Sequence, residues 1–100
     1  MTRYFAEAEA ELNEAARFYE DRLKGLGASF LDVVEVAVRN IELHPRRNPV
    51  VCAPVRRRLL PKFPYAILYV IYHDEIIVVA IAHLSRHPTY WLGRLEESNR

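Results

Sequence analysis

The chain has 100 residues, 51% of them apolar, and a net charge of +1. This length and composition fit one domain, residues 1–100, and exclude a disordered chain. One cysteine, Cys52, excludes a disulfide framework and a cysteine-based zinc site. The apolar runs reach about nine residues, too few to span a bilayer. Because the charged N-terminus also lacks a signal-peptide core, we expect a cytoplasmic protein with no membrane contact.

The small net charge conceals an uneven distribution. Residues 1–43 carry a balance of −4, whereas residues 44–100 carry +5. An anionic target is therefore expected to meet the second half of the chain. The plainer interpretation is ordinary helix-surface chemistry in the first half and chance in the second.

The first half predicts two helices. Between Ala6 and Lys24, apolar residues recur at spacings of three and four, and Gly25 and Gly27 end the segment. A second helix is expected from Ala28 or Ser29 to Leu43, because Pro45 disfavours helical geometry in the residue before it. The short linker makes the pair an antiparallel hairpin.

The second half predicts strands. Residues 45–54 hold three prolines and are expected to form a loop, followed by a strand over Val55–Leu60. The runs Tyr65–Tyr72 and Ile76–His83 are rich in β-branched and aromatic residues and flank a short polar turn, which indicates a hairpin. A short strand over residues 2–5 and a short final helix over residues 86–95 complete the order (β)-α-α-β-β-β-(α). We therefore predict an α+β fold, with a helical hairpin packed on a small antiparallel sheet.

Two groups of residues could carry chemistry. Arg56, Arg57 and Arg58 alternate across the predicted strand, and guanidinium groups match phosphate geometry. Because Arg56 and Arg58 point the same way, at most two of the three serve one site. The plainer interpretation is an edge strand protected from aggregation by its charge.

The second group follows the last strand and consists of His83, Arg86, His87, Tyr90, Trp91 and Arg94. If this segment is helical, Arg86, Tyr90 and Arg94 fall on one face. A ribonuclease needs a base, a cation for the phosphate and an acid, and His83 or His87, Arg86 and Tyr90 match those roles by residue type. An unshifted tyrosine, with a pKa of about 10, is a poor acid at neutral pH. The alternatives are that Trp91 is a packing anchor, Tyr90 a packing residue with a wet hydroxyl and His87 a solvated residue.

Other chemistry has little support in the sequence. His83 and His87 are four residues apart, but no nearby Cys or Asp completes a metal site, and the three glycines form no phosphate-binding loop. We expect neither a metal nor another cofactor.

The ordered set of motifs resembles the RelE/ParE superfamily of bacterial type II toxins, often described as plasmid stabilisation proteins, over essentially the whole chain. The motifs that carry the resemblance are Ala8–Leu12, Ala15-Ala16, Tyr19-Glu20, Gly25–Gly27 with Phe30-Leu31, Pro45, Val55–Arg57, Phe63–Tyr65, Tyr69, His83–Pro88 and Tyr90-Trp91.

The resemblance implies a toxin that inhibits growth by acting on DNA gyrase or on mRNA at the ribosome, and that a cognate antitoxin neutralises in a hetero-oligomer. The mRNA-cleaving branch usually places an arginine in the strand occupied here by Tyr65–Tyr72, which holds no basic residue. The sequence is closer to the ParE-like side, and whether the chain is an enzyme stays open. By this resemblance and by residue type, the predicted site residues are Arg56, Arg58, His83, Arg86 and Tyr90.

Two other functions are compatible with the sequence. One is an inactive family member that acts as a binding module with its antitoxin and regulates their shared operon. The other is a stand-alone RNA-binding domain, for which steeply salt-dependent RNA binding would be typical.

Overall fold

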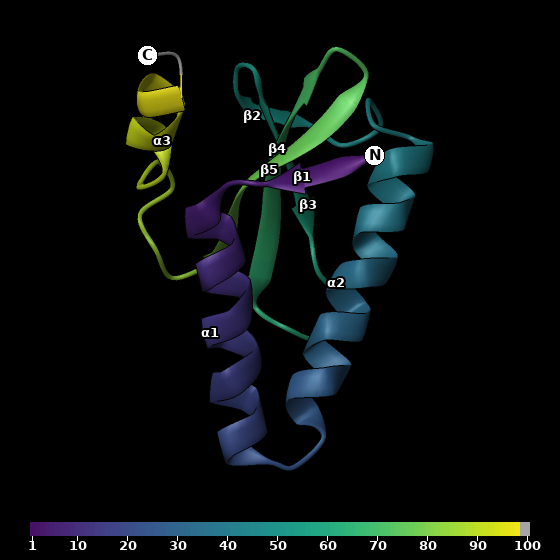
Figure 1. Ribbon diagram of the computed structural model, residues 1–100, viewed down its shortest axis with the longest axis vertical. Helices are drawn as coiled ribbons and strands as arrows, with labels where there is room; N and C mark the ends of the chain where they lie inside the picture. Colours follow the sequence, from purple (N-terminus) through teal and green to yellow (C-terminus); the bar gives the residue numbers. More distant parts are fainter. Residues whose placement is uncertain (99–100) are drawn as a thin grey trace.

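The computed structural model describes residues 1–98. Two helices, α1 (Ala6–Arg22) and α2 (Leu26–Leu43), form an antiparallel hairpin that covers one face of a sheet (Figure 1). This confirms the predicted α+β class, although α2 begins earlier than Ala28. The reason is a cap that comes from the preceding helix rather than from Ser29. The Glu20 carboxylate accepts hydrogen bonds from the backbone N–H groups of Gly25 and Gly27 at 3.0 Å, so it caps the start of α2.

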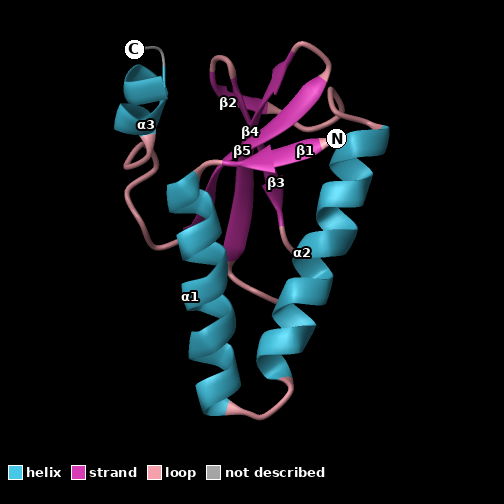
Figure 2. Ribbon diagram, viewed as in Figure 1, coloured by secondary structure: helices cyan, strands magenta, loops and turns pink. Residues whose placement is uncertain are grey.

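Within residues 1–98, five strands form one sheet in the order β1-β5-β4-β3-β2 (Figure 2). The strands are β1 (Thr2–Tyr4), β2 (Val50–Cys52), β3 (Val55–Leu59), β4 (Tyr65–Tyr72) and β5 (Glu75–His83). The β4–β5 hairpin lies at the centre, as its two-faced apolar runs predict. Its turn has two residues, His73 and Asp74, both with positive φ. The pairs β2–β3, β3–β4 and β4–β5 are antiparallel.

Two features of the sheet differ from the prediction. β2 lies inside the segment that was expected to be a loop, where Val50 pairs with Arg56 despite the flanking prolines. β1 runs parallel to β5, so the sheet is mixed rather than antiparallel. A parallel neighbour is possible because α1 and α2 intervene between β1 and the strands that follow.

The core is divided by the sheet into two clusters. The larger one lies between the sheet and the helical hairpin, and it includes Phe30, Ile41, Ile67 and Tyr69. The smaller one lies on the other face and contains Val55, Leu68, Val79, Ala80, Ala82 and Trp91. The C-terminal segment that supplies Trp91 thus covers the face that the hairpin leaves open.

This C-terminal segment differs from the helix predicted over residues 86–95. Residues 84–91 form turns, and the helix α3 (Leu92–Ser98) begins only after them. Backbone bonds from Arg86 N–H to His83 O and from Tyr90 N–H to His87 O close two successive tight turns. The segment therefore bends back over the sheet before α3 starts.

β5 contains an irregularity close to the end of its pairing with β1. The register with β4 shifts between Leu68 and Tyr69, so Val79 is an extra residue on β5. On its other side, β5 pairs with β1 only as far as Val78, after which Phe5 N–H bonds to Val78 O and the chain turns into α1. Beyond that point, no strand within residues 1–98 lies beside the outer edge of β5.

The described helices also bear on membrane insertion. None of the helices in residues 1–98 combines the length and the apolar character needed to cross a membrane.

Gly27 provides a test of the helical hairpin. A Cβ at this buried position would lie 2.5 Å from Ala16 O and 2.9 Å from Glu20 Cβ, so the helices would have to separate. We expect Gly27→Ala to lower the free energy of unfolding by about 1–3 kcal/mol, the usual cost of overpacking. Gly93→Ala is the matched control, because among the described residues no neighbouring atom lies within 4 Å of its added Cβ. Urea unfolding measures both, and equal stability of the two variants would contradict this packing.

Candidate functional site

The three consecutive arginines of β3 are divided between the two faces of the sheet. Arg56 pairs with Tyr69 and Arg58 with Ile67, which both face the helical hairpin. Arg57 pairs with Leu68, whose side chain belongs to the opposite cluster. Arg56 and Arg58 therefore do not share a face with Arg57.

Arg56 has structural partners. Its guanidinium donates to Arg46 O at 3.1 Å and to Asn48 O at 2.7 Å. The buried Tyr69 hydroxyl donates to Pro45 O at 2.7 Å and accepts from Asn48 Nδ2 at 3.1 Å. Together, these side chains hold the loop between α2 and β2 in place.

Arg58 lies beside α2, in a hollow that Val36 and Lys62 also line. Its Nε is buried and has no hydrogen-bond partner within the described residues. This hollow lies away from the C-terminal segment that supplies the other predicted site residues.

The remaining predicted residues lie near the exit of β5, where His83 pairs with Tyr65 and its ring lies 5.0 Å from the Tyr65 ring on the hairpin side. His83, Arg86 and Tyr90 line a cavity of about 180 Å³, together with Arg57 from β3 and the indole of Trp91. His87 lines it as well, and no Asp or Glu occurs among the described residues that form its wall. The sequence grouped Arg56 and Arg58 with this cluster, whereas the structure places Arg57 beside it, because the face of each arginine depends on a register that the sequence does not show.

Both histidines of the cavity have one ring nitrogen engaged. The backbone N–H of Ser85 donates to His83 Nδ1 at 3.0 Å, and that of Thr89 donates to His87 Nδ1 at 3.2 Å. A backbone N–H can only donate, so each Nδ1 is an acceptor and the neutral ring carries its proton on Nε2. In this state each histidine offers an N–H donor at Nε2, while its Nδ1 accepts a backbone hydrogen bond.

Tyr90 is tied to α1 by its hydroxyl, which donates to Glu11 Oε2 at 2.6 Å. Burial, followed by this hydrogen bond and the charge of Glu11, raises the pKa of Tyr90 above its ordinary value of 10.0, whereas Arg94 and Arg86 lower it. The phenol therefore keeps its proton at neutral pH, which makes it an even poorer acid than a free tyrosine.

Glu11 is the centre of this network. Its carboxylate accepts two hydrogen bonds from the Arg94 guanidinium, at 2.8 and 2.9 Å, and one from Ile81 N–H at 3.1 Å. Arg94 also donates to Val79 O at 3.0 Å. The two side chains thus occupy the backbone groups of β5 that lie beyond the end of β1.

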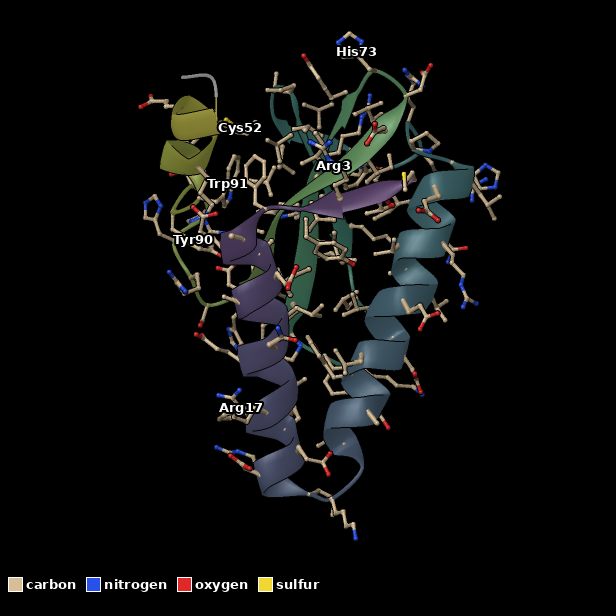
Figure 3. The ribbon with its side chains drawn as sticks, in the orientation of Figure 1. Arg3, Arg17, Cys52, His73, Tyr90 and Trp91 are labelled. Atoms are coloured by element: carbon tan, nitrogen blue, oxygen red, sulfur yellow. The ribbon has the colours of Figure 1, made fainter. Side chains whose placement is uncertain are left out.

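Two cations lie against the ring of Tyr90. The Arg86 guanidinium carbon is 3.9 Å from the ring centroid and that of Arg94 is 5.1 Å away. Figure 3 shows Tyr90 and Trp91 on the C-terminal segment, beside the start of α1. Arg86, Tyr90 and Arg94 were expected on one helical face, and they do meet, although turns rather than a helix bring them together.

Sequence reasoning missed Arg57 and Glu11. A signal for Glu11 exists, since it lies three residues after Ala8 and four before Ala15, and both alanines are buried. An acid on the buried side of a helix indicates a partner that neutralises it. Trp91, 1% exposed and donating to Pro88 O at 2.9 Å, is the packing anchor that the sequence suggested.

The groups around this cavity are chemically suited to an anion. Arg57 and Arg86 supply cations, the histidines supply N–H donors, and the rigid aromatic wall limits the space. Among residues 1–98, no three His, Cys, Asp or Glu side chains gather closely enough to hold a metal ion.

The different positions of neighbouring arginines predict different effects on stability. Arg56→Ala removes two hydrogen bonds to backbone carbonyls of the loop after α2, so we expect a loss of about 1–2 kcal/mol in the free energy of unfolding. Arg57→Ala removes an exposed side chain and should change it by less than about 0.5 kcal/mol. Chemical unfolding of both variants tests this, and a larger loss for Arg57→Ala would contradict the assignment.

The raised pKa of Tyr90 predicts a dependence of stability on pH. The folded chain holds the phenol proton more tightly than the unfolded chain, so its stabilising contribution is complete below pH 10.0 and is lost as the pH rises towards the folded pKa. Tyr90→Phe has no such proton, so its stability should decline less steeply in the same range. Urea unfolding from about pH 8 to about pH 12 measures both slopes, and parallel slopes would contradict the prediction.

Comparisons with known proteins agree with this architecture. A chain of the chromosomal ParDE toxin–antitoxin system from P. aeruginosa superposes with a TM-score of 0.62 at 17% sequence identity, covering 84% of this chain and 95% of that one. At this identity the likeness shows a shared fold. Among curated proteins, none matches the sequence. A family model described as the ParE toxin of the type II toxin–antitoxin system parDE matches residues 3–88. Because that match covers most of the sequence, the chain belongs to the ParE toxin family of type II toxin–antitoxin systems.

Proposed function

We propose that this chain inhibits growth by binding DNA gyrase in its complex with DNA, without cutting RNA, and that a cognate antitoxin neutralises it. The observation that carries the proposal is the state of the titratable groups in the cavity. The sequence assigned proton transfer to His83, His87 and Tyr90. The Nδ1 atom of each histidine and the hydroxyl of Tyr90 form hydrogen bonds within the fold.

RNA cleavage would require more than this site offers. A base must remove the proton of the 2′-hydroxyl while an acid protonates the leaving oxygen. The histidine Nδ1 atoms accept backbone hydrogen bonds, and the raised pKa of Tyr90 opposes proton donation. Binding makes no such demand, because Arg57 and Arg86 attract an anionic surface whatever the state of these groups.

An anionic target fits the charge of this cavity, while Arg86 and His83 also border a neighbouring hollow that Glu11 and Glu14 of α1 line. The cavity wall contains two arginines and no carboxylate among the described residues. The bound DNA of a gyrase complex presents phosphates, for which guanidinium groups are suitable partners. The ParE family membership of the chain favours the same target over mRNA.

Adjacent arginines provide the test. Inducible expression without an antitoxin should arrest growth. Both Arg57→Ala and Arg86→Ala should raise the inducer concentration needed for arrest by about tenfold or more. Arg58→Ala is the matched control, because it removes the same charge from the same strand but on the opposite face. Equal effects of Arg57→Ala and Arg58→Ala would contradict the proposed site.

The target is tested separately. A gyrase cleavage assay with purified chain should show stabilised DNA breaks, and primer extension on cellular mRNA should show no new ends. New mRNA ends without any effect on gyrase would overturn the proposal in favour of a ribonuclease. Soluble expression without growth arrest, combined with altered operator binding by an antitoxin complex, would instead identify an inactive binding module.

A further inference from the structure

Arg86 is an exposed side chain on a turn, yet it has a defined position. Its guanidinium carbon lies 3.9 Å from the centroid of the Tyr90 ring. A long, flexible cation on a loop would otherwise sample many rotamers, and the negative face of an aromatic ring restricts it. The ring of Tyr90 therefore determines where this cation stands at the cavity.

The ring of Tyr90 is itself held from the other end. Its hydroxyl donates to Glu11 Oε2 at 2.6 Å, and the Arg94 guanidinium lies 5.1 Å from its centroid. Glu11 in turn accepts from Ile81 N–H of β5 at 3.1 Å. A continuous series of contacts thus leads from the sheet through Glu11 and Tyr90 to Arg86.

We infer that Glu11 is a positioning residue of the target-binding site, acting through Tyr90 on Arg86. Glu11 does not line the cavity that Arg57 and Arg86 share, but it borders a neighbouring hollow together with Arg86. Its positioning effect acts through the ring of Tyr90, against which the cation rests. The inference rests on the proposed function only in taking Arg86 as a group that contacts the target.

Arg57 offers an internal comparison. It reaches the same cavity from β3, whereas Arg86 reaches it from the turn after β5. The position of Arg57 follows from the ladder with β4 and does not depend on Tyr90. Loss of the Tyr90 ring should therefore remove the contribution of Arg86 and leave that of Arg57 intact.

A double-mutant cycle tests the inference. The measured quantity is the concentration of purified chain that gives half-maximal effect on gyrase, for Tyr90→Leu, Arg86→Ala, Arg57→Ala and the two doubles that contain Tyr90→Leu. We expect Tyr90→Leu to weaken the effect about tenfold, with no further loss on adding Arg86→Ala. Arg57→Ala should add its full loss to that of Tyr90→Leu. Full additivity of Tyr90→Leu with Arg86→Ala would overturn the inference.

The share of Glu11 is tested by Tyr90→Phe, which keeps the ring and removes the hydrogen bond to the carboxylate. We expect Tyr90→Phe to inhibit gyrase less than the wild type and more than Tyr90→Leu. The ring-current shift of the Arg86 Hδ protons in NMR spectra should also be smaller than in the wild type. An unchanged shift and unchanged inhibition in Tyr90→Phe would show that Glu11 does not position Arg86. Because this variant retains the packed ring, it keeps the test decisive if Tyr90→Leu does not fold.

The NMR shift also separates the two proposals. If the wild-type chain has no effect on gyrase, the proposed function fails. The Arg86 shift would still report whether Tyr90 and Glu11 hold the guanidinium, since it requires no target. A wild-type spectrum without a displaced Arg86 Hδ signal would overturn the positioning inference even if gyrase inhibition were observed.

Discussion

The Glu11–Arg94 ion pair is the interaction on which the functional face of this toxin depends. β1 ends at Tyr4, so β5 continues beyond it with backbone groups that have no neighbouring strand. Glu11 accepts a hydrogen bond from Ile81 N–H, and Arg94 donates one to Val79 O. These two side chains therefore pair with backbone groups that a longer β1 would otherwise reach. The pair is only about 15% exposed, and removing one partner of a largely buried ion pair typically costs about 3–5 kcal/mol because it leaves the other charge uncompensated.

The same pair joins three parts of the chain that are distant in sequence. Glu11 comes from the first helix, Ile81 from the central hairpin and Arg94 from the last helix. Without this contact, residues 84–91 would be held to the sheet mainly by Trp91 and the small cluster around it. Those residues form one side of the cavity, and strands that include Arg57 form the other, so the cavity is closed only while the C-terminal segment is docked.

Much of the fold could be predicted from the sequence because its signals are local. The apolar stripe of α1, the glycines after it and the two β-branched runs each specify an element within a few residues. The pairing partner of β1 and the existence of β2 depend on contacts across the chain, which periodicity does not report. The site was predicted in part for the same reason: His83, Arg86 and Tyr90 are close in sequence, whereas Arg57 and Glu11 join them only through register and tertiary packing.

The three arginines of β3 have different surroundings. One residue of register places Arg57 at the cavity, while Arg56 secures a loop and Arg58 lies beside α2. Charge on the binding face is thereby concentrated at two arginines, one held by the sheet and one by an aromatic ring. His83, His87 and Tyr90 form hydrogen bonds that hold the turns and the C-terminal segment in place. These hydrogen bonds fix the shape of the face, and the guanidinium groups of Arg57 and Arg86 give its cavity a positive charge.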